Sequence, residues 1–568
     1  MRYERVVLVG LSGSGKSTVS RLLAERLGWE ATDTDVILAA RAGKPIPRIF
    51  AEDGEAAFRA YETEALTEAC RGAGRVIATG GGVVTVDANW TIMRGEHDGT
   101  RSLVVHLAAS PDLLAARLAA HAVEQGEDVA ARPLLAGQPP ADALRTMYAR
   151  RAPAYARADF TIETGEKAPQ RIADTLAALV RGEPAVLWEA TLDSDAHPSH
   201  LVVGNALLDM LAARIVTRWP AAELSGAVIV TDERVNAVLG ERANVALAAL
   251  GVPLKATLVV PAGEPSKALA QAGELYSRLA ACGADRRTVI VALGGGVVGD
   301  LAGFVAATYL RGVPLVQVPT TLLAMVDSSV GGKTAVDLPA GKNLVGAFYQ
   351  PHLVVIDPDL LATLPEREFV SGWAEITKAG LIEANVPGVA VPTLAASLLD
   401  RAASLLDREP LTLAGIIARS VALKRAVVRD DPHETTGLRA ILNMGHTAGH
   451  AIEAAALAAA PPGMLHGEAI ALGMRAEVAL AASLGACDAD VPGYVARLLD
   501  AFGLPRRASD LGFALRIEDV LPYIARDKKT VGGRTTWLLP AGAAGACRVA
   551  PVRDVSPDAA REAIAAVL

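Results

Sequence analysis

Two groups of residues in this chain have the types and the spacing needed to handle phosphate. The first reads GLSGSGKST from Gly10 to Thr18 and fits the pattern GxxxxGK[ST], between an apolar run and a helical pattern. In that context backbone N–H groups surround phosphate oxygens, a lysine reaches the β/γ-phosphates and a hydroxyl holds magnesium. The pattern therefore predicts a site for ATP with Mg²⁺, with Lys16 in a catalytic role and with the following binding residues: Gly13, Gly15, Lys16, Ser17 and Thr18.

Further residues in the first 180 positions are candidates for binding the phosphate acceptor. They are Asp33 and Asp35 in DTD, Arg59 in FRAYE, the glycines Gly80, Gly81 and Gly82, and Arg151 in RRAPAY. Each of them alone is more often a solvated charge or a turn. Together, two guanidiniums suit a carboxylate through forked hydrogen bonds, and a carboxylate suits vicinal hydroxyls.

The order and spacing of these elements resemble shikimate kinase over essentially all of residues 1–180. The resemblance implies that Asp35, Arg59, Arg151 and the loop from Gly80 to Gly82 bind shikimate, and that Asp33 supports the magnesium held by Ser17. It also implies that Asp35 orients or deprotonates the 3-hydroxyl, and that Arg132 in ARPLL is the lid arginine that neutralises the transferring phosphoryl group. The rival is another small P-loop kinase, such as one for gluconate; the paired arginines favour a carboxylated acceptor.

The second group begins with GGGVVGD, from Gly294 to Asp300, after the apolar run TVIVAL. Glycines at the end of a strand allow a dinucleotide pyrophosphate to approach the backbone. The following stretch, VPTTLLAMVDSSVGGKTAVD with GKN at Gly341, is expected to place polar residues in loops at the sheet edge, and its two lysines in glycine-rich turns suggest an anion. These residues are Thr320, Asp327, Lys333, Lys342 and Asn343.

A metal site is indicated further along the chain. His446 and His450 are four residues apart in a helical pattern, so they share a face and could share a metal, although such a pair is about as often only a polar face. Spacing alone therefore predicts that these two histidines are the metal ligands. With His466 in LHGE and Glu375 in AEITK also available, two of the imidazoles and one carboxylate can form a set with an open position, as in a catalytic zinc site.

Residues 185–568 resemble 3-dehydroquinate synthase through DSSVGGKTAV, GLRAILNMGHTAGHAIE and LHGEAIALG. The resemblance implies that Glu375, His446 and His466 hold Zn²⁺ or Co²⁺, while His450 binds substrate phosphate and handles protons. It implies an NAD⁺ site made by Asp232, Glu264, Lys267, Gly294, Gly295, Gly296, Asp300, Thr320, Thr321 and Lys342. It further implies substrate contacts from the following residues: Asp327, Lys333, Lys342, Asn343, Lys378, Lys424, Arg439, Asn443, His450 and Lys528. Three of these, Lys333, Lys378 and His450, would also be catalytic. Arg425 is an alternative to Lys424, and Lys529 is an alternative to Lys528.

The implied reaction converts 3-deoxy-D-arabino-heptulosonate 7-phosphate to 3-dehydroquinate and phosphate, and Arg311 reaches toward a neighbouring subunit, which implies a homodimer. The rival interpretation is a polyol or iron-dependent alcohol dehydrogenase. In such an enzyme the converging lysines and Arg439 would have no role. Either half could also be a docking module that binds a nucleotide without turnover. We expect two enzymes that work independently within one chain.

The elements that must position these residues follow from length and patterning. At roughly 100–200 residues per domain, 568 residues predict several domains. Alternating strands and helices predict α/β folds: a P-loop domain at 1–181 and a dinucleotide-binding domain at 185–356, followed by a mostly helical metal- and substrate-binding domain at 357–568.

Composition narrows the classes of function. The formal net charge of −8 argues against general nucleic-acid binding, so anionic substrates must be bound by local clusters of Lys and Arg. The four cysteines show no CxxC spacing, which argues against a disulfide framework and a thiolate zinc site. Neither a signal peptide nor an apolar run long enough for a membrane helix is visible, so we expect a cytoplasmic protein.

Overall fold

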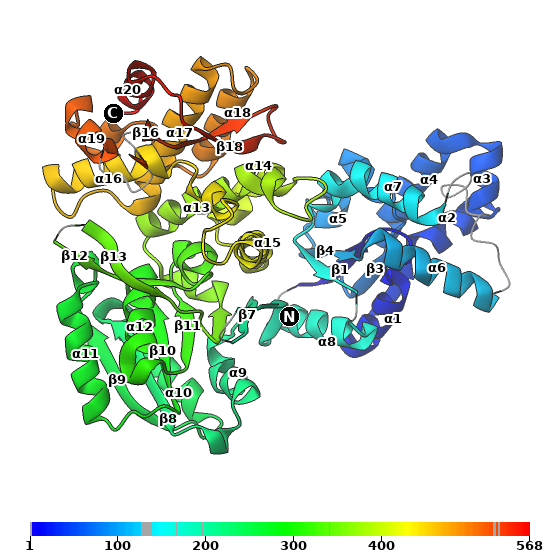
Figure 1. The fold of residues 1–568 in the computed structure, drawn as a ribbon. Helices are drawn as coiled ribbons and strands as arrows, with labels where there is room; N and C mark the ends of the chain where they lie inside the picture. Colours follow the sequence, from blue (N-terminus) through cyan, green and yellow to red (C-terminus); the bar gives the residue numbers. More distant parts are fainter. Residues whose placement is uncertain are drawn as a thin grey trace. The chain divides into compact units, whose positions relative to one another are not determined.

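The structure is a computed structural model that describes residues 3–125, 139–165, 167–194, 197–339, 341–525, 530–531 and 534–568. The chain forms two compact units, Met1–Leu187 and Trp188–Leu568, which can be followed by colour in Figure 1. Among the described residues, no helix combines the length and the apolar character needed to cross a membrane.

The first unit contains a parallel five-stranded sheet in the order β2-β3-β1-β4-β5. Its middle strand, β1, reads RVVLV and is buried at every position, as is typical of a parallel sheet covered by helices. The strands are β1 (Arg5–Val9), β2 (Glu30–Asp33), β3 (Arg75–Ala78), β4 (Ser102–Ala108) and β5 (Phe160–Glu163). The helices are α1 (Lys16–Leu27), α2 (Thr34–Ala42), α3 (Ile46–Glu52), α4 (Gly54–Ala69), α5 (Asp87–Arg94), α6 (Pro111–Gln125), α7 (Pro140–Tyr155) and α8 (Pro169–Arg181).

The loop from Gly10 to Gly15 connects β1 to α1, as the sequence predicts. The helix ends at Leu27 because Gly28 adopts a left-handed conformation, with φ 68°, and its N–H donates to the carbonyls of Ala24 and Glu25. This strand, loop and helix order places the first turn of α1 at the carboxyl end of the middle strand, where phosphate binds in this class of sheet.

The second unit begins with a seven-stranded sheet in the order β6-β7-β14-β11-β10-β8-β9. The α/β pattern expected from the sequence is confirmed. The following strands pair in parallel: β8 (Gly226–Asp232), β9 (Leu254–Val260), β10 (Thr288–Gly294), β11 (Leu315–Pro319) and β14 (Leu353–Ile356). Strands β6 (Ala185–Leu192) and β7 (Ser199–Asn205) extend one edge. The accompanying helices are α9 (Leu211–Arg218), α10 (Glu233–Ala248), α11 (Leu269–Ala281) and α12 (Gly296–Thr308).

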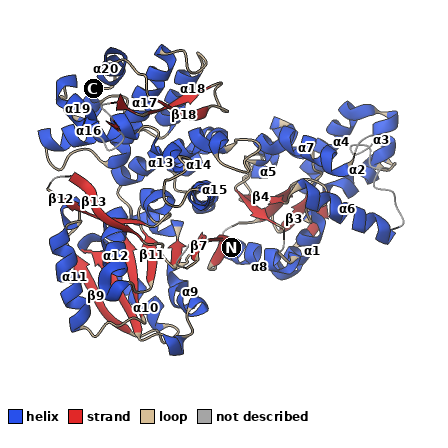
Figure 2. Cartoon of the chain, in the orientation of Figure 1, coloured by secondary structure: helices blue, strands red, loops and turns tan. Residues whose placement is uncertain are grey.

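The rest of the second unit is mostly helical, as Figure 2 shows. Its helices are α13 (Glu366–Ile382), α14 (Leu394–Leu406), α15 (Pro410–Asp430), α16 (His446–Ala459), α17 (His466–Ser483), α18 (Val491–Ala501), α19 (Ile517–Ala525) and α20 (Pro557–Ala565). Two short antiparallel pairs complete it: β15 (Thr530–Val531) with β16 (Arg534–Thr535), and β17 (Trp537–Ala541) with β18 (Arg548–Val552). The helix pair α16 and α17 packs closely and carries the three histidines of interest.

One expectation about local structure is wrong. Lys333, Lys342 and Asn343 do not lie in open loops, because Lys333–Leu338 and Gly341–Phe348 form an antiparallel hairpin, β12 and β13. Asp327, expected in a loop as well, lies in the π-helical turn Ala324–Ser328. The alternation of buried and more exposed residues in KTAVDL is a strand pattern that the flanking glycines concealed. Both lysines are therefore held on a hydrogen-bonded hairpin rather than on open loops.

Candidate active sites

In the first unit the P-loop lysine, Lys16, is buried, and its side chain contacts the backbone of its own loop. Lys16 Nζ donates to the carbonyl oxygens of Gly10 at 2.8 Å and of Leu11 at 3.0 Å. Burial lowers the pKa of this ammonium to about 8, although the nearby carboxylates of Asp35 and Asp33 oppose the shift. A cation held in such a desolvated loop is well placed to attract phosphate oxygens.

Two oxygen ligands suited to magnesium meet beside the P-loop. Ser17 Oγ donates to Asp33 Oδ2 at 2.7 Å, and Asp33 Oδ1 accepts from the backbone N–H of Asp35 at 3.0 Å as it caps α2. A hydroxyl and a carboxylate are hard oxygen donors of the kind Mg²⁺ prefers. The geometry thus fits the predicted magnesium position.

The predicted acceptor residues converge around the loop that follows β3. Arg151 Nη1 donates to the Gly81 carbonyl at 2.9 Å, and an added Cβ at Gly82 would lie only 2.0 Å from Arg59 Nη1. Likewise, a Cβ at Gly80 would lie 2.8 Å from Asp35 Oδ1. The absence of side chains on this loop is what allows the charged groups to approach it.

Asp35 is also tuned by its surroundings. Burial raises the pKa of its carboxyl group, the neighbouring Asp33 raises it further, and Lys16 opposes both. A carboxylate whose pKa is raised accepts a proton more readily than a free aspartate, which suits a group that orients and deprotonates a hydroxyl.

Sequence reasoning missed two residues of this site. Glu62 is 1% exposed; its Oε2 accepts from Arg59 Nη1 at 2.6 Å, and its Oε1 has no hydrogen-bond partner among the described residues. Tyr155 Oη donates to the Gly81 carbonyl at 2.6 Å, and its ring stacks on His106. The i,i+3 spacing of Arg59 and Glu62 in a helical pattern was the available signal. Arg132 lies outside the described residues.

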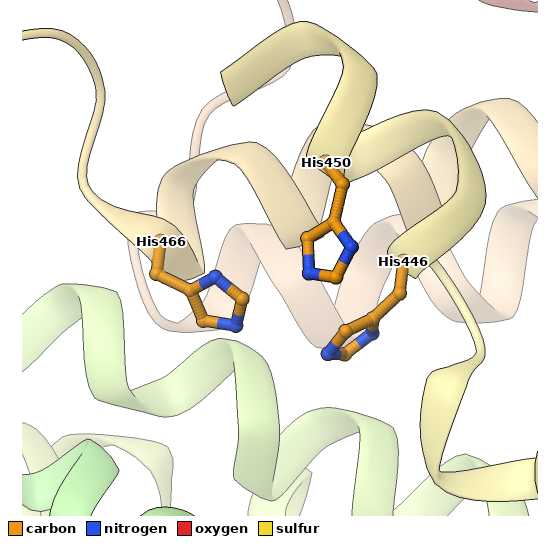
Figure 3. A group of neighbouring side chains, drawn as sticks. All are labelled: His446, His450 and His466. Carbon is orange, nitrogen blue, oxygen red and sulfur yellow. The ribbon is translucent and has the colours of Figure 1, made fainter. Parts of the chain in front are cut away.

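In the second unit, three imidazoles approach one another, as Figure 3 shows. One ring nitrogen from each of His446, His450 and His466 lies within 4.8 Å of the others, so the three could hold a metal ion. Glu375 lies alongside, with its Oε1 atom 3.6 Å from His446 Nε2 and 3.8 Å from His466 Nε2. That oxygen is buried and has no hydrogen-bond partner within the described part of the chain, as expected of a ligand atom.

The other ring nitrogens of two of these histidines are already engaged. His446 Nδ1 lies 3.1 Å from the Met444 carbonyl, and His466 Nδ1 lies 3.2 Å from Glu453 Oε2. Both acceptors require a proton on Nδ1, which puts the lone pair of each ring on Nε2, the nitrogen that faces Glu375 Oε1. Glu453 was missed from the sequence, because a glutamate on a predicted helix is ordinarily a solvated charge.

The surroundings of Glu453 favour the charged form of its carboxyl group. Burial alone would raise its pKa, but His466 and Lys342 outweigh that effect and hold the pKa below its usual range. Lys342 Nζ lies 2.9 Å from Glu453 Oε1 and 3.3 Å from Glu264 Oε1. The hairpin lysine therefore connects a residue predicted to bind NAD⁺ with the carboxylate that supports His466.

Several of the predicted substrate-binding cations surround the histidines and already have partners. Lys378 Nζ donates to Glu375 Oε2 one turn away, and Lys424 Nζ contacts Asp327 Oδ1 at 2.6 Å. Lys424 thus contacts another predicted substrate residue, whereas Arg425, the alternative to it, donates to the Thr191 carbonyl. Burial would raise the pKa of Asp327, but Lys424 and Lys378 outweigh it and hold the pKa well below normal.

The remaining predicted substrate residues lie on the hairpin and ahead of α16. Lys333 pairs with Glu434, and Arg439, which is 2% exposed, donates to the carbonyls of Gly331 and Pro432. Asn443 ends the short helical turn Arg439–Asn443 that leads into α16. Lys528 and Lys529 lie outside the described residues.

The predicted dinucleotide residues gather at the carboxyl ends of β8, β10 and β11. The glycines Gly294 to Gly296 connect β10 to α12, and Asp232 at the end of β8 caps α10. Lys267 Nζ contacts Asp300 Oδ2 at 2.5 Å; burial raises the pKa of Asp300 to about 6 although Lys267 opposes the shift.

Two hydroxyls flank this glycine loop. Thr320 Oγ1 is buried without a hydrogen-bond partner in the described ranges, and an added Cβ at Gly295 would lie 3.1 Å from Thr321 Cγ2. A glycine loop at a helix N-terminus with an unused buried hydroxyl fits a bound pyrophosphate or ribose.

Arg311 stands apart from these clusters. It follows Leu310 in a strained turn, with left-handed φ angles of 51° for Leu310 and 66° for Arg311. Left-handed backbone is costly for residues other than glycine, so this turn is strained at both positions.

These features define a P-loop kinase unit followed by a unit with a Rossmann-type sheet and a helical, histidine-bearing part. Residues 12–181 match the family described as shikimate kinase. Residues 257–371 and 372–530 match the N-terminal and C-terminal families of 3-dehydroquinate synthase.

Individual relatives agree with these matches. The chain is 47% identical over 366 residues to 3-dehydroquinate synthase from Symbiobacterium thermophilum, covering 64% of this chain and 95% of that relative. A crystal structure of 2-deoxy-scyllo-inosose synthase with carbaglucose-6-phosphate, NAD⁺ and Co²⁺ is 27% identical, with a TM-score of 0.58, covering 67% of this chain and all of that one. The structure of 2-epi-5-epi-valiolone synthase from Streptomyces hygroscopicus with NAD⁺ and Zn²⁺ is 27% identical, with a TM-score of 0.55, covering 66% and 97%.

The chain belongs to the 3-dehydroquinate synthase family and carries a shikimate kinase domain ahead of the synthase. Its two activities are those of shikimate kinase and 3-dehydroquinate synthase, both of the shikimate pathway. The sequence expectation of two joined enzymes is confirmed.

Proposed function

We propose that the kinase unit transfers the γ-phosphoryl group of ATP to the 3-hydroxyl of shikimate. Ser17 and Asp33 would hold magnesium, and Lys16 would bind the β/γ-phosphates. Arg59 and Arg151 would bind the shikimate carboxylate while Asp35 orients the attacking hydroxyl and accepts its proton. The observation that carries this proposal is the convergence of Asp35, Arg59 and Arg151 on the side-chain-free loop from Gly80 to Gly82.

We propose that the synthase unit holds Zn²⁺ or Co²⁺ through Glu375, His446 and His466, with His450 left for the substrate. The single observation that carries this choice is Glu375 Oε1, which is buried, lacks a hydrogen bond among the described residues, and faces Nε2 of both histidines. The Nδ1 contacts with Met444 and Glu453 orient the two imidazoles for the same task. His450 is exposed, as suits a residue that meets the substrate.

The glycine loop Gly294 to Gly296, with Thr320 and Lys267, would hold NAD⁺. When bound, the metal supplies Lewis-acid polarisation of a substrate oxygen, and NAD⁺ supplies reversible hydride transfer. The chain's own residues bind and orient: the cations around the site neutralise the phosphate and carboxylate of 3-deoxy-D-arabino-heptulosonate 7-phosphate. These cations are Lys333, Lys378, Lys424 and Arg439.

The leaving phosphate can serve as its own base for the neighbouring C–H, so the residues of this site need not include a strong base. His450 would hold the phosphate and relay its proton. We further propose that the enzyme is a homodimer in which Arg311 reaches the neighbouring subunit's site, with domains at 1–181, 185–356 and 357–568.

Release of inorganic phosphate from 3-deoxy-D-arabino-heptulosonate 7-phosphate tests the synthase proposal. The assay uses the full chain with NAD⁺, before and after chelation and again after zinc is returned. Release that is lost on chelation and restored by zinc is expected. No release from folded, zinc-loaded protein would refute the metal and substrate assignment and favour an alcohol dehydrogenase. Shikimate-dependent ADP formation in the same preparation tests the kinase separately.

A further inference from the structure

Glu477 is a fully buried carboxylate with no part in the chemistry proposed above. It lies on α17 and is 0% exposed. Its Oε2 accepts from the Gly445 N–H at 2.7 Å, and its Oε1 accepts from the Thr447 N–H at 3.1 Å and the Ala448 N–H at 3.5 Å. These three N–H groups flank His446, the first residue of α16.

This contact replaces an ordinary helix cap. The first N–H groups of a helix have no partner inside the helix, and a side chain at the preceding position usually accepts from them. That position in α16 is Gly445, which has no side chain and a left-handed φ of 79°. Glu477, from the neighbouring helix, therefore supplies the cap, and its negative charge lies at the positive end of the α16 dipole.

Close packing fixes the two helices at this point. A Cβ at Gly445 would lie 2.6 Å from Met474 Cγ, and a Cβ at Gly473 would lie 1.9 Å from the Gly445 carbonyl oxygen. Further along, Gly449 approaches Ile470, so the helices run antiparallel. Helix α17 therefore presents His466 at its own start and holds the start of α16, where His446 lies.

We propose that Glu477 is a positioning residue of the metal site, one that sets metal affinity by fixing the backbone around His446. It touches neither metal nor substrate; it acts through the N–H groups on either side of His446. The inference rests on the proposed function, because it requires that His446 is a metal ligand. Residues that orient metal ligands through hydrogen bonds typically contribute 10–100-fold to metal affinity.

The chain offers a matched control in Glu383. This buried carboxylate also caps a helix that is not its own, because its Oε2 accepts from the N–H groups of Thr393 and Leu394, both at 2.6 Å, at the start of α14. Helix α14 carries none of the predicted site residues. Glu383→Gln and Glu477→Gln therefore both remove the negative charge of a buried cap, but only Glu477 accepts from N–H groups next to a proposed metal ligand.

The test is zinc binding to the full, metal-stripped chain, measured by competition with a chromogenic chelator, together with urea unfolding of each metal-free variant. We expect Glu477→Gln to weaken zinc binding by about tenfold or more, and Glu383→Gln to leave it within about twofold of the parent. In the Co²⁺-loaded proteins, the visible absorption bands should shift for Glu477→Gln alone.

A zinc affinity for Glu477→Gln within about threefold of the parent would overturn the inference, as would equal weakening in Glu383→Gln. If Glu477→Gln does not fold, Glu477→Asp, which keeps the charge but shortens the side chain, is judged by the same outcomes. A parent chain that binds no zinc would instead overturn the proposed metal site, and with it the role of Glu477.

Discussion

Gly80 offers a direct test of the shikimate site, because its missing side chain lets two carboxylates approach the loop. A Cβ atom there would lie 2.8 Å from Asp35 Oδ1 and 2.8 Å from Glu62 Oε1. Ordinary contact begins at 3.4 Å, so each oxygen would have to retreat by about 3.4 − 2.8 = 0.6 Å. The φ angle of Gly80 is not among the positive ones, so alanine fits the backbone and acts only through the carboxylates.

We expect Gly80→Ala to lower kcat/KM for shikimate by ~10–100-fold, because displacing reacting groups by about 1 Å can cost ~10²-fold. That loss corresponds to ~1.4–2.7 kcal/mol of transition-state stabilisation. The assay is ADP formation with shikimate varied at saturating ATP, and the KM for ATP should stay near the parent value. Phosphate release by the synthase in the same preparation is the internal control.

Two results would refute the reasoning about Gly80. A kcat/KM for shikimate within about twofold of the parent would mean that Asp35 and Glu62 do not need their present positions. A parallel fall in synthase activity would mean that the substitution damages the whole chain.

Three further predictions concern the P-loop, the metal site and pH. Lys16→Met should abolish ADP formation and leave phosphate release by the synthase unchanged; loss of both in folded protein would show that the halves are coupled. Glu453→Gln should weaken zinc binding by about 10–100-fold, with synthase activity recovering in excess zinc, because His466 loses its charged partner; unchanged zinc affinity would contradict that role. Burial, together with the nearby His197 and Arg218, lowers the pKa of His352 to about 3. The unfolded chain binds this proton near pH ~6.5, so the free energy of unfolding is highest above that pH and falls as the pH drops toward 3. Between pH 7 and 4.5 this loss is on the order of 2–3 kcal/mol. His352→Phe should therefore reduce the acid-induced fall in the urea midpoint of the synthase unit, and equal falls in the parent and the variant would rule this role out.

The sequence predicts the strands well because strands depend on local patterns. Each apolar run followed by glycine or aspartate, such as TVIVALGGG and AVIVTDE, appears as a strand with its polar residues at the carboxyl end. The hairpin β12 and β13 was misjudged because glycines beside KTAVDL and GKN were interpreted as open turns. Glycine marks turns and close approaches alike, and only tertiary packing distinguishes them.

The metal site shows what spacing can and cannot decide. An i,i+4 pair places His446 and His450 on one face, and the structure does bring both together with His466. Spacing cannot show that Glu375 Oε1 lies between His446 and His466 without a hydrogen bond of its own among the described residues. That is a property of three helices packed together, and no single segment of sequence contains it.

The residues missed by sequence reasoning are mainly buried glutamates, and each of them holds a positively charged or N–H group in place. Glu62 pairs with Arg59, Glu453 with His466 and Lys342, and Glu477 with the first N–H groups of α16. In a helical pattern Glu453 and Glu477 look like solvated surface charges, because their partners come from tertiary packing or from the backbone. The partner of Glu62, Arg59, lies on the same helix at i,i+3, so what the sequence conceals there is the burial of the pair.

Carboxylates that hold a neighbouring cation in place also affect how an acidic chain could bind anionic substrates. Lys424, Lys333 and Lys342 are paired with Asp327, Glu434 and Glu453, so each cation is held in place before an anion arrives. In the proposed function, an incoming phosphate or carboxylate would meet ammonium groups that are already oriented, and it would compete with a fixed carboxylate rather than with bulk water. Orientation is therefore obtained at the expense of some attraction, which favours a doubly charged phosphate over weaker anions. The same carboxylates that lower the net charge of the chain can thereby make its basic sites selective.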